Sequence, residues 1–85
     1  MPVEIEKEIR SIIAEVSGFE EEEITPDKNF YRDLEIDSIK SIEITVAIEK
    51  SFKISIRDED VPNITTVKSA IDLVKSLINQ STLNK

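Results

Sequence analysis

A serine between an acidic loop and an apolar helical pattern is the residue of this chain best placed to do chemistry. Asp37, Ser38 and Ile39 follow Leu34 and open a pattern that runs to Phe52. A serine at such a junction is expected to expose its hydroxyl and to hold it in place. Nucleophilic catalysis needs a base beside the serine, and the chain has no His and no Cys. The sequence therefore favours a modified serine over a catalytic one.

Lys40 is the candidate base nearest to Ser38 in the sequence. It lies two residues further on, and residues two apart on a helix do not face each other. We therefore predict no catalytic residue and no enzymatic activity. The start of a helix has another use, because its free N–H groups and its dipole favour a phosphate. Ser38 could thus carry a phosphodiester, or it could simply cap the helix.

The segment before this serine is acidic enough to raise the question of a metal site. Residues 20–37 contain eight acidic side chains against two basic ones. A calcium loop uses alternating oxygen ligands, a central Gly and a closing Glu, and Asp27, Asn29 and Asp33 lack this arrangement. We predict no dedicated metal site. The segment is then either a solvated loop or a docking surface for basic partners.

Three segments with helical periodicity must position the serine. The first covers residues 3–16 and ends at Gly18, since glycine suits a helix C-terminus. The second covers residues 38–51 and can be capped by the Asp or Ser at its start. The last begins at the threonine pair 65–66 and gives way to a polar tail over residues 81–85.

The second predicted helix is apolar on two sides. One row consists of Ile44, Ile48 and Phe52, and the other consists of Ile39, Ile42 and Val46. Lys40, Glu43 and Lys50 lie in the polar gap between the rows. Such a helix either lies deep in a core or shows one side to a partner. Both options stay open on periodicity alone.

The two connections complete the predicted fold. Residues 19–37 contain a turn signal at 25–27 and six large apolar side chains, which we expect to pin the segment across the helices: Phe19, Ile24, Phe30, Tyr31, Leu34 and Ile36. Residues 52–56 alternate like a strand but have no evident partner, so we predict an extended connector. Residues 58–61 could form one helical turn, stopped by Pro62. The fold class is therefore all-α, a small bundle of three main helices plus one short helix.

Composition sets limits on function. A net charge of −7 argues against nucleic-acid binding and favours basic protein partners. No stretch approaches the roughly 20 apolar residues of a membrane span. The absence of Cys excludes disulfides and makes a reducing cytoplasm the simplest compartment. We expect one domain over residues 1–85, monomeric and free-standing, the last because of the initiating Met1 and the short tail.

Residues 33–39 read Asp-Leu-Glu-Ile-Asp-Ser-Ile, which resembles the Asp-Leu-Gly-x-Asp-Ser-Leu signature of acyl carrier proteins. The likeness continues through Ile42-Glu43, Ala47-Ile48-Glu49, Phe52, Ile56, Asp58-Glu59, Ile64-Thr65-Thr66-Val67 and Ala70-Ile71-Asp72. It covers nearly the whole chain, and these motifs are specific in combination. The resemblance implies the acyl-carrier bundle and the role of a carrier.

The resemblance also implies the site. Ser38, flanked by Asp37 and Ile39, would carry 4′-phosphopantetheine attached by a phosphopantetheinyl transferase from coenzyme A with magnesium. Its thiol would hold acyl groups as thioesters for fatty-acid, lipid or polyketide-type biosynthesis. The implied partner-binding residues are Glu43, Val46, Glu49, Ile56 and Asp58. They would meet basic docking patches on enzymes that load and use the acyl group.

Departures from the family pattern indicate a specialised carrier. Glu35 stands where the family usually has Gly, so a positive φ there would be strained. Lys40 and Lys50 stand where housekeeping fatty-acid carriers are typically acidic. The alternatives are an aminoacyl or peptidyl carrier and, of another class, an unmodified helical interaction module in which Ser38 only caps.

Overall fold

The computed structural model describes the backbone of residues 4–83 and the side chains of residues 4–79. In chain order the elements are α1 (Ile5–Ser17), the short 3₁₀ helix η1 (Glu21–Glu23), α2 (Ser38–Phe52), the 3₁₀ helix η2 (Asp58–Asn63) and α3 (Val67–Leu83). This part of the chain contains no strand, only an isolated bridge between Asn29 and Thr66. The predicted all-α fold is confirmed, and η1 is an additional short helix.

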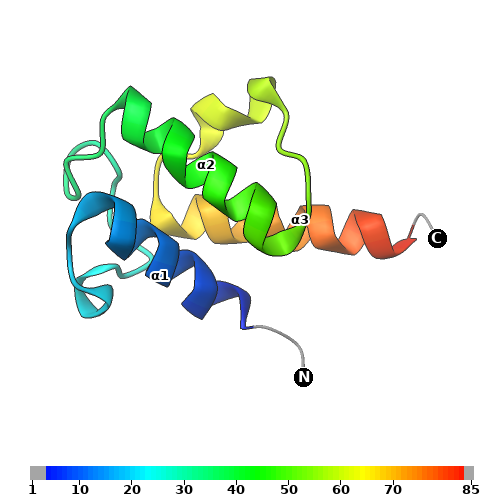
Figure 1. Ribbon diagram of the computed structural model, residues 1–85, viewed down its shortest axis with the longest axis horizontal. Coiled ribbons are helices and arrows are strands. Elements are labelled where there is room, and N and C mark those ends of the chain that lie inside the picture. The colour runs from blue at the N-terminus through cyan, green and yellow to red at the C-terminus, as the bar shows by residue number, and fades with distance from the viewer. Residues whose placement is uncertain (1–3, 84–85) are drawn as a thin grey trace.

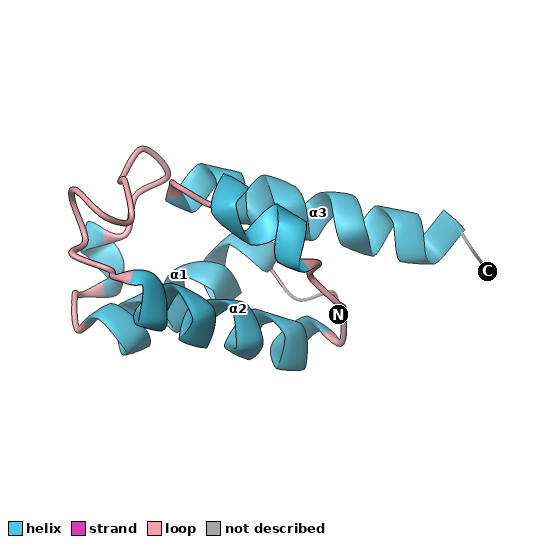
Figure 2. Ribbon diagram, turned by 90° about the horizontal axis from the view of Figure 1, so that it is seen from above, coloured by secondary structure: helices cyan, strands magenta, loops and turns pink. Residues whose placement is uncertain are grey.

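The three long helices pack as a bundle around one core. α1 contacts both α2 and α3. α1 and α2 run in opposite directions, and α3 projects beyond both at its C-terminal end (Figure 1). The loops between α1 and α2 gather at one end of the bundle (Figure 2). The start of α2 therefore lies at the end of the molecule where the long connection folds. None of the helices described is both long and apolar enough to cross a membrane.

The ends of the helices agree with the sequence signals. Gly18 follows α1 with φ 85°, and its N–H donates to the carbonyl of Ala14 at 2.9 Å. At the start of α3, Thr66 Oγ1 accepts from the N–H of Ser69 at 3.1 Å, and Ser69 Oγ accepts from the N–H of Thr66 at 2.9 Å. The predicted glycine terminus and threonine cap are confirmed.

The end of α3 differs from expectation, and the expected start of the first helix is not described. Val3, where the first predicted helix begins, lies outside the described residues. α3 continues as a helix to Leu83, three residues into the expected polar tail. The last two residues of that tail, 84 and 85, also lie outside the described part.

The long connection between α1 and α2 is held by side chains that enter the core. Ile24, Phe30, Leu34 and Ile36 are each at most 1% exposed. Phe30 also donates its N–H to the carbonyl of Thr65 at 2.8 Å. The prediction that apolar residues pin this segment is confirmed for these four and for the partly buried Phe19, which packs against the core, whereas Tyr31 is 50% exposed.

The second connection is shorter than predicted, because Phe52 still belongs to α2 and Lys53 is left-handed with φ 57°, which leaves residues 54–57 without helix or strand. The helical turn after it is longer than expected. η2 includes Pro62 and ends at Asn63 instead of stopping before the proline. The φ that the proline ring imposes is compatible with a 3₁₀ helix, so the ring removes only one N–H donor there. The N–H of Ile64 then donates to the carbonyl of Val61 and closes the turn.

Candidate functional site

Ser38 is the first residue of α2, and its side chain is exposed. Asp37 is the N-cap, because its Oδ1 accepts from the N–H of Lys40 at 2.9 Å. The carbonyl of Asp37 also accepts from the N–H of Ser41 at 2.9 Å. The acidic residue thus caps the helix, and the hydroxyl of Ser38 is not used for capping.

Two backbone donors remain free beside this hydroxyl. In the described part of the chain, no acceptor pairs with the N–H of Ser38 or of Ile39. Unpaired N–H groups at a helix start, together with the helix dipole, favour a bound phosphate. The carboxylate of Asp37, the nearest negative charge in sequence, accepts from the backbone N–H of Lys40. The geometry therefore suits a phosphate ester on Ser38.

The loop before Ser38 is fixed by a side-chain network. Asn29 Oδ1 accepts from the N–H groups of Tyr31 and Arg32 at 2.9 and 3.0 Å, and Asp33 Oδ2 accepts from the N–H of Asn29 at 2.8 Å. The N–H of Ile36 donates to the carbonyl of Phe30 at 2.8 Å. These bonds close the loop on itself and fix the approach to α2.

Glu35 has a left-handed backbone in this loop, with φ 54°. Its neighbours Leu34 and Ile36 are both buried, whereas Glu35 itself is exposed. A non-glycine residue in this region pays a steric cost that glycine does not. The sequence left open whether this position has a positive φ, and the structure shows that it does, with glutamate in a conformation that glycine adopts at lower cost.

Four of the five expected partner-binding residues keep exposed or partly exposed side chains, and one does not. Glu43 and Asp58 are exposed, Val46 is 41% exposed and Glu49 is partly exposed. Ile56 is only 7% exposed, and its side chain belongs to the core.

Glu49 has a structural partner within the chain. Its Oε2 accepts from the N–H of Ile56 at 2.7 Å, which ties α2 to the connector after it. This carboxylate is therefore engaged before any other protein arrives. The role of these residues in docking stays a prediction.

The structure also shows one exposed residue that was left out of the expected partner set. Ile42 is 57% exposed and lies between Ile39, at 68%, and Val46. The spacing of three and four residues places these side chains on one face of α2. That spacing was visible in the sequence, and it identifies Ile42 as part of the same surface.

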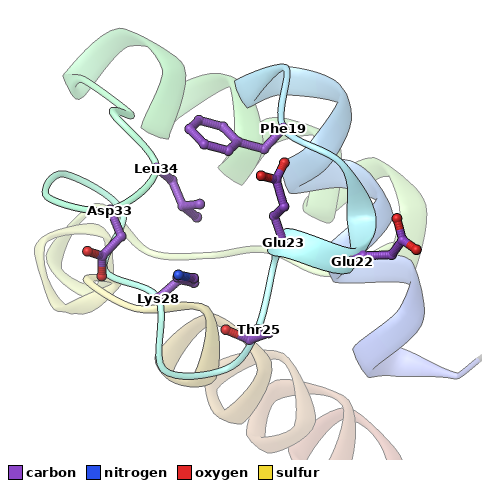
Figure 3. Close-up of a pocket in the computed structure, with 7 residues that line it drawn as sticks. All are labelled: Phe19, Glu22, Glu23, Thr25, Lys28, Asp33 and Leu34. Atoms are coloured by element: carbon purple, nitrogen blue, oxygen red, sulfur yellow. The ribbon is translucent and has the colours of Figure 1, made fainter.

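A pocket of about 270 Å³ lies in the long connection. Figure 3 shows Phe19 and Leu34 on one side of it and Thr25 and Lys28 on the other. The remaining lining residues are Glu22, Glu23 and Asp33. Glu23 and Asp33 already accept from backbone N–H groups, at 2.9 and 2.8 Å. Within the described residues, no group of three or more acidic side chains could hold a metal ion. Ser38 is not part of this pocket.

Two groups outside the pocket titrate away from their ordinary values. The hydrogen bond from Thr25 Oγ1, at 2.6 Å, lowers the pKa of Asp27. The hydrogen bond and charge of Asp60, and then the charge of Glu59, raise the pKa of Arg57. Arg57 pairs with Glu59 at 3.1 Å and with Asp60 at 3.2 Å. Asp58 is thus the acid of η2 that has no such pair within the described residues.

Comparison with known proteins agrees with this geometry. Residues 7–74 match the family described as "Phosphopantetheine attachment site". The structure is similar to that of an acyl carrier protein from Enterococcus faecalis, with a TM-score of 0.74 and 32% sequence identity. This similarity covers 86% of this chain and 92% of that one.

Proposed function

The chain belongs to the phosphopantetheine-attachment family of carrier proteins, and from this premise we propose that Ser38 carries the prosthetic group. Members of this family are carriers without catalytic activity, and their group is 4′-phosphopantetheine. Its thiol supplies the thioester chemistry that a chain without Cys lacks. We further propose that residues 1–85 form a single carrier domain.

The exposed hydroxyl at the first position of α2 is the observation that carries this proposal. Asp37 already caps the helix, so the alternative that Ser38 serves only as a cap loses its basis. The free N–H groups of Ser38 and Ile39 favour the negative charge of a phosphodiester. The chain thus presents the hydroxyl of Ser38 and stabilises the charge of the phosphodiester. The phosphopantetheinyl transferase catalyses the attachment.

Intact mass spectrometry tests the attachment. The protein is incubated with coenzyme A, magnesium and a broad-specificity phosphopantetheinyl transferase. We expect the mass of one phosphopantetheine to be added to the native chain and none to a Ser38→Ala variant. A Ser51→Ala variant is the control, because this serine is exposed at the other end of α2, and it should be modified fully. No addition to the native chain, or addition to Ser38→Ala, would refute the assignment.

The cargo is proposed to be an acyl group used in fatty-acid, lipid or polyketide-type biosynthesis. The 32% identity to an acyl carrier protein supports this choice over an aminoacyl or peptidyl cargo. The lysines at 40 and 50 support a specialised carrier instead of a housekeeping one. We expect slow loading by a standard fatty-acid malonyltransferase, whereas loading as efficient as that of a housekeeping carrier would argue against specialisation.

The proposed partners are the transferase and the enzymes that load and use the acyl group. Residues 20–37 hold eight acidic and two basic side chains of a chain whose net charge is −7, and they lie close to the start of α2. Basic patches on these enzymes would meet that segment, Glu43 and Asp58 through long-range attraction that speeds docking and weakens with salt. A reducing cytoplasm remains the proposed compartment.

A further inference from the structure

The outward face of α2 exposes a row of apolar side chains. Ile39, Ile42 and Val46 are 68%, 57% and 41% exposed, and we name them the α2 stripe. Ile44 and Ile48, on the opposite side of the same helix, are each 1% exposed. The side of α2 that contains Ile44 and Ile48 therefore packs in the core. The α2 stripe lies on the other side and adds little to the packing of the bundle. It begins at the residue next to Ser38.

The charged residues beside the stripe do not share the acidity of the chain. Lys40, Glu43 and Lys50 follow one edge of it, and none of the three forms an ion pair within the described residues. The first turn of α2 has no acid, and its last turn contains Lys50. Glu49 is engaged with the N–H of Ile56. An otherwise strongly acidic protein thus presents a nearly neutral helix face with two lysines, of which Lys50 is exposed and Lys40 is partly exposed.

The size of the stripe and the charge of the chain argue against a second copy as its occupant. Stable interfaces bury at least about 1,200 Å² in total, and three aliphatic side chains supply only a fraction of that area. A second copy would also bring another net charge of −7. A short-lived contact with a different protein fits both observations better.

Docking on α2 is already expected from the family resemblance; beyond it, we propose that the partner's groove around the α2 stripe carries carboxylates on its rim that pair with Lys40 and Lys50. This inference rests on the proposed function, since the partner would be an enzyme that acts on the group attached to the neighbouring Ser38. Docking then has two parts of opposite sign. The acidic segment 20–37, Glu43 and Asp58 meet basic residues, whereas Lys40 and Lys50 meet acidic ones. A partner with an entirely basic docking surface would be repelled by both lysines.

Two synthetic helical peptides test this charge preference without a known partner. They share one apolar face, which is flanked by Glu in one peptide and by Lys in the other. The ¹⁵N-labelled, unmodified protein is titrated with each, and backbone amide shifts report site and affinity. We expect the Glu-flanked peptide to perturb residues 39–50 and to bind there more tightly. The Lys-flanked peptide should perturb residues 20–37 instead.

A charge-reversed variant and a matched control sharpen the test. Each exposed charge pair changes affinity by about two- to five-fold, so Lys40→Glu combined with Lys50→Glu should reverse the preference on α2. Lys7→Glu combined with Lys68→Glu changes the net charge equally on exposed sites of α1 and α3, and it should keep the preference. Circular dichroism verifies that both variants fold.

Several outcomes would overturn the proposal. They are tighter binding of the Lys-flanked peptide on α2, equal binding of the two peptides there, or no perturbation of α2 by the Glu-flanked peptide. The titration uses protein that has no group on Ser38. A negative titration therefore argues against the proposed docking charge without bearing on attachment. The coenzyme A experiment tests attachment alone.

Discussion

Glu49 Oε2 lies 2.7 Å from the backbone nitrogen of Ile56 and accepts its hydrogen bond. The contact spans seven residues and joins the last turns of α2 to the extended connector. It also helps to explain why Ile56 is in the core, because the bond fixes the backbone that turns this side chain inward. A residue expected to contact partners thus has a structural role first.

Replacing Glu49 should therefore destabilise the fold. Hydrogen bonds to charged groups contribute about 1.5–3 kcal/mol, and partial exposure places Glu49→Ala toward the lower end of that range. Glu43→Ala is the matched control, because this acid is exposed on the same helix and should change stability by less than about 0.5 kcal/mol. Urea unfolding measures both variants. Equal stability of the two would show that the bond to Ile56 contributes nothing.

Phe30 and Tyr31 are adjacent aromatic residues with opposite environments. Phe30 is fully buried and Tyr31 is half exposed. Phe30→Ala should lower the free energy of unfolding by about 3–5 kcal/mol, because it removes core contacts and leaves a cavity. Tyr31→Ala should cost much less. Thermal unfolding followed by circular dichroism compares the pair, and a similar loss for both would mean that the long connection is not pinned through its phenylalanine.

The left-handed backbone at Glu35 predicts a stabilising substitution. Glu35→Gly removes the steric cost of φ 54° and should raise the free energy of unfolding by about 0.5–1 kcal/mol. Glu22→Gly, within η1, should instead destabilise, because glycine there only adds freedom to the unfolded chain. Chemical denaturation distinguishes the two. A loss of stability in both variants would contradict strain at residue 35.

The Thr25–Asp27 pair predicts a pH effect. The pKa of Asp27 is lowered in the folded protein, so this carboxylate stabilises the fold above its ordinary pKa. That contribution is lost as the pH falls through the lowered pKa. Thr25→Val should return the pKa of Asp27 toward its ordinary value, whereas Thr25→Ser keeps the hydroxyl and should keep the shift. The pKa of Asp27 in each variant is measured from its carboxyl ¹³C shift as a function of pH. An unchanged pKa in Thr25→Val would exclude the Thr25 hydroxyl as the cause of the lowered pKa.

The long helices could be predicted from the sequence because local signals and packing agree there. α2 has an acidic N-cap, which the residue type before the helix indicates. It also has an inward and an outward row of apolar residues, which their spacing indicates. Gly18 is the chain's single glycine and follows the first helix, so its conformation was predictable too. The exposure of Ser38 could be predicted once the start of α2 was predicted, because residues at this junction between loop and helix lie on the surface.

The remaining features depend on contacts between residues that are separate in the sequence or on weak local preferences. The bond from Glu49 to the N–H of Ile56 exists only once the connector has turned back toward α2. η1 is one turn of a 3₁₀ helix made of glutamates, and no apolar periodicity marks it. Pro62 was expected to stop a helix, but it is compatible with the 3₁₀ geometry of η2.

The outward row of α2 consists of two isoleucines and one valine, all of them β-branched. In a helix such side chains are already restricted at χ1, with one rotamer strongly preferred for Val and Ile. Docking them therefore costs little further side-chain entropy, whereas ordering long flexible side chains costs more. If this row is the docking surface proposed above, its side chains are already close to one shape before any partner arrives.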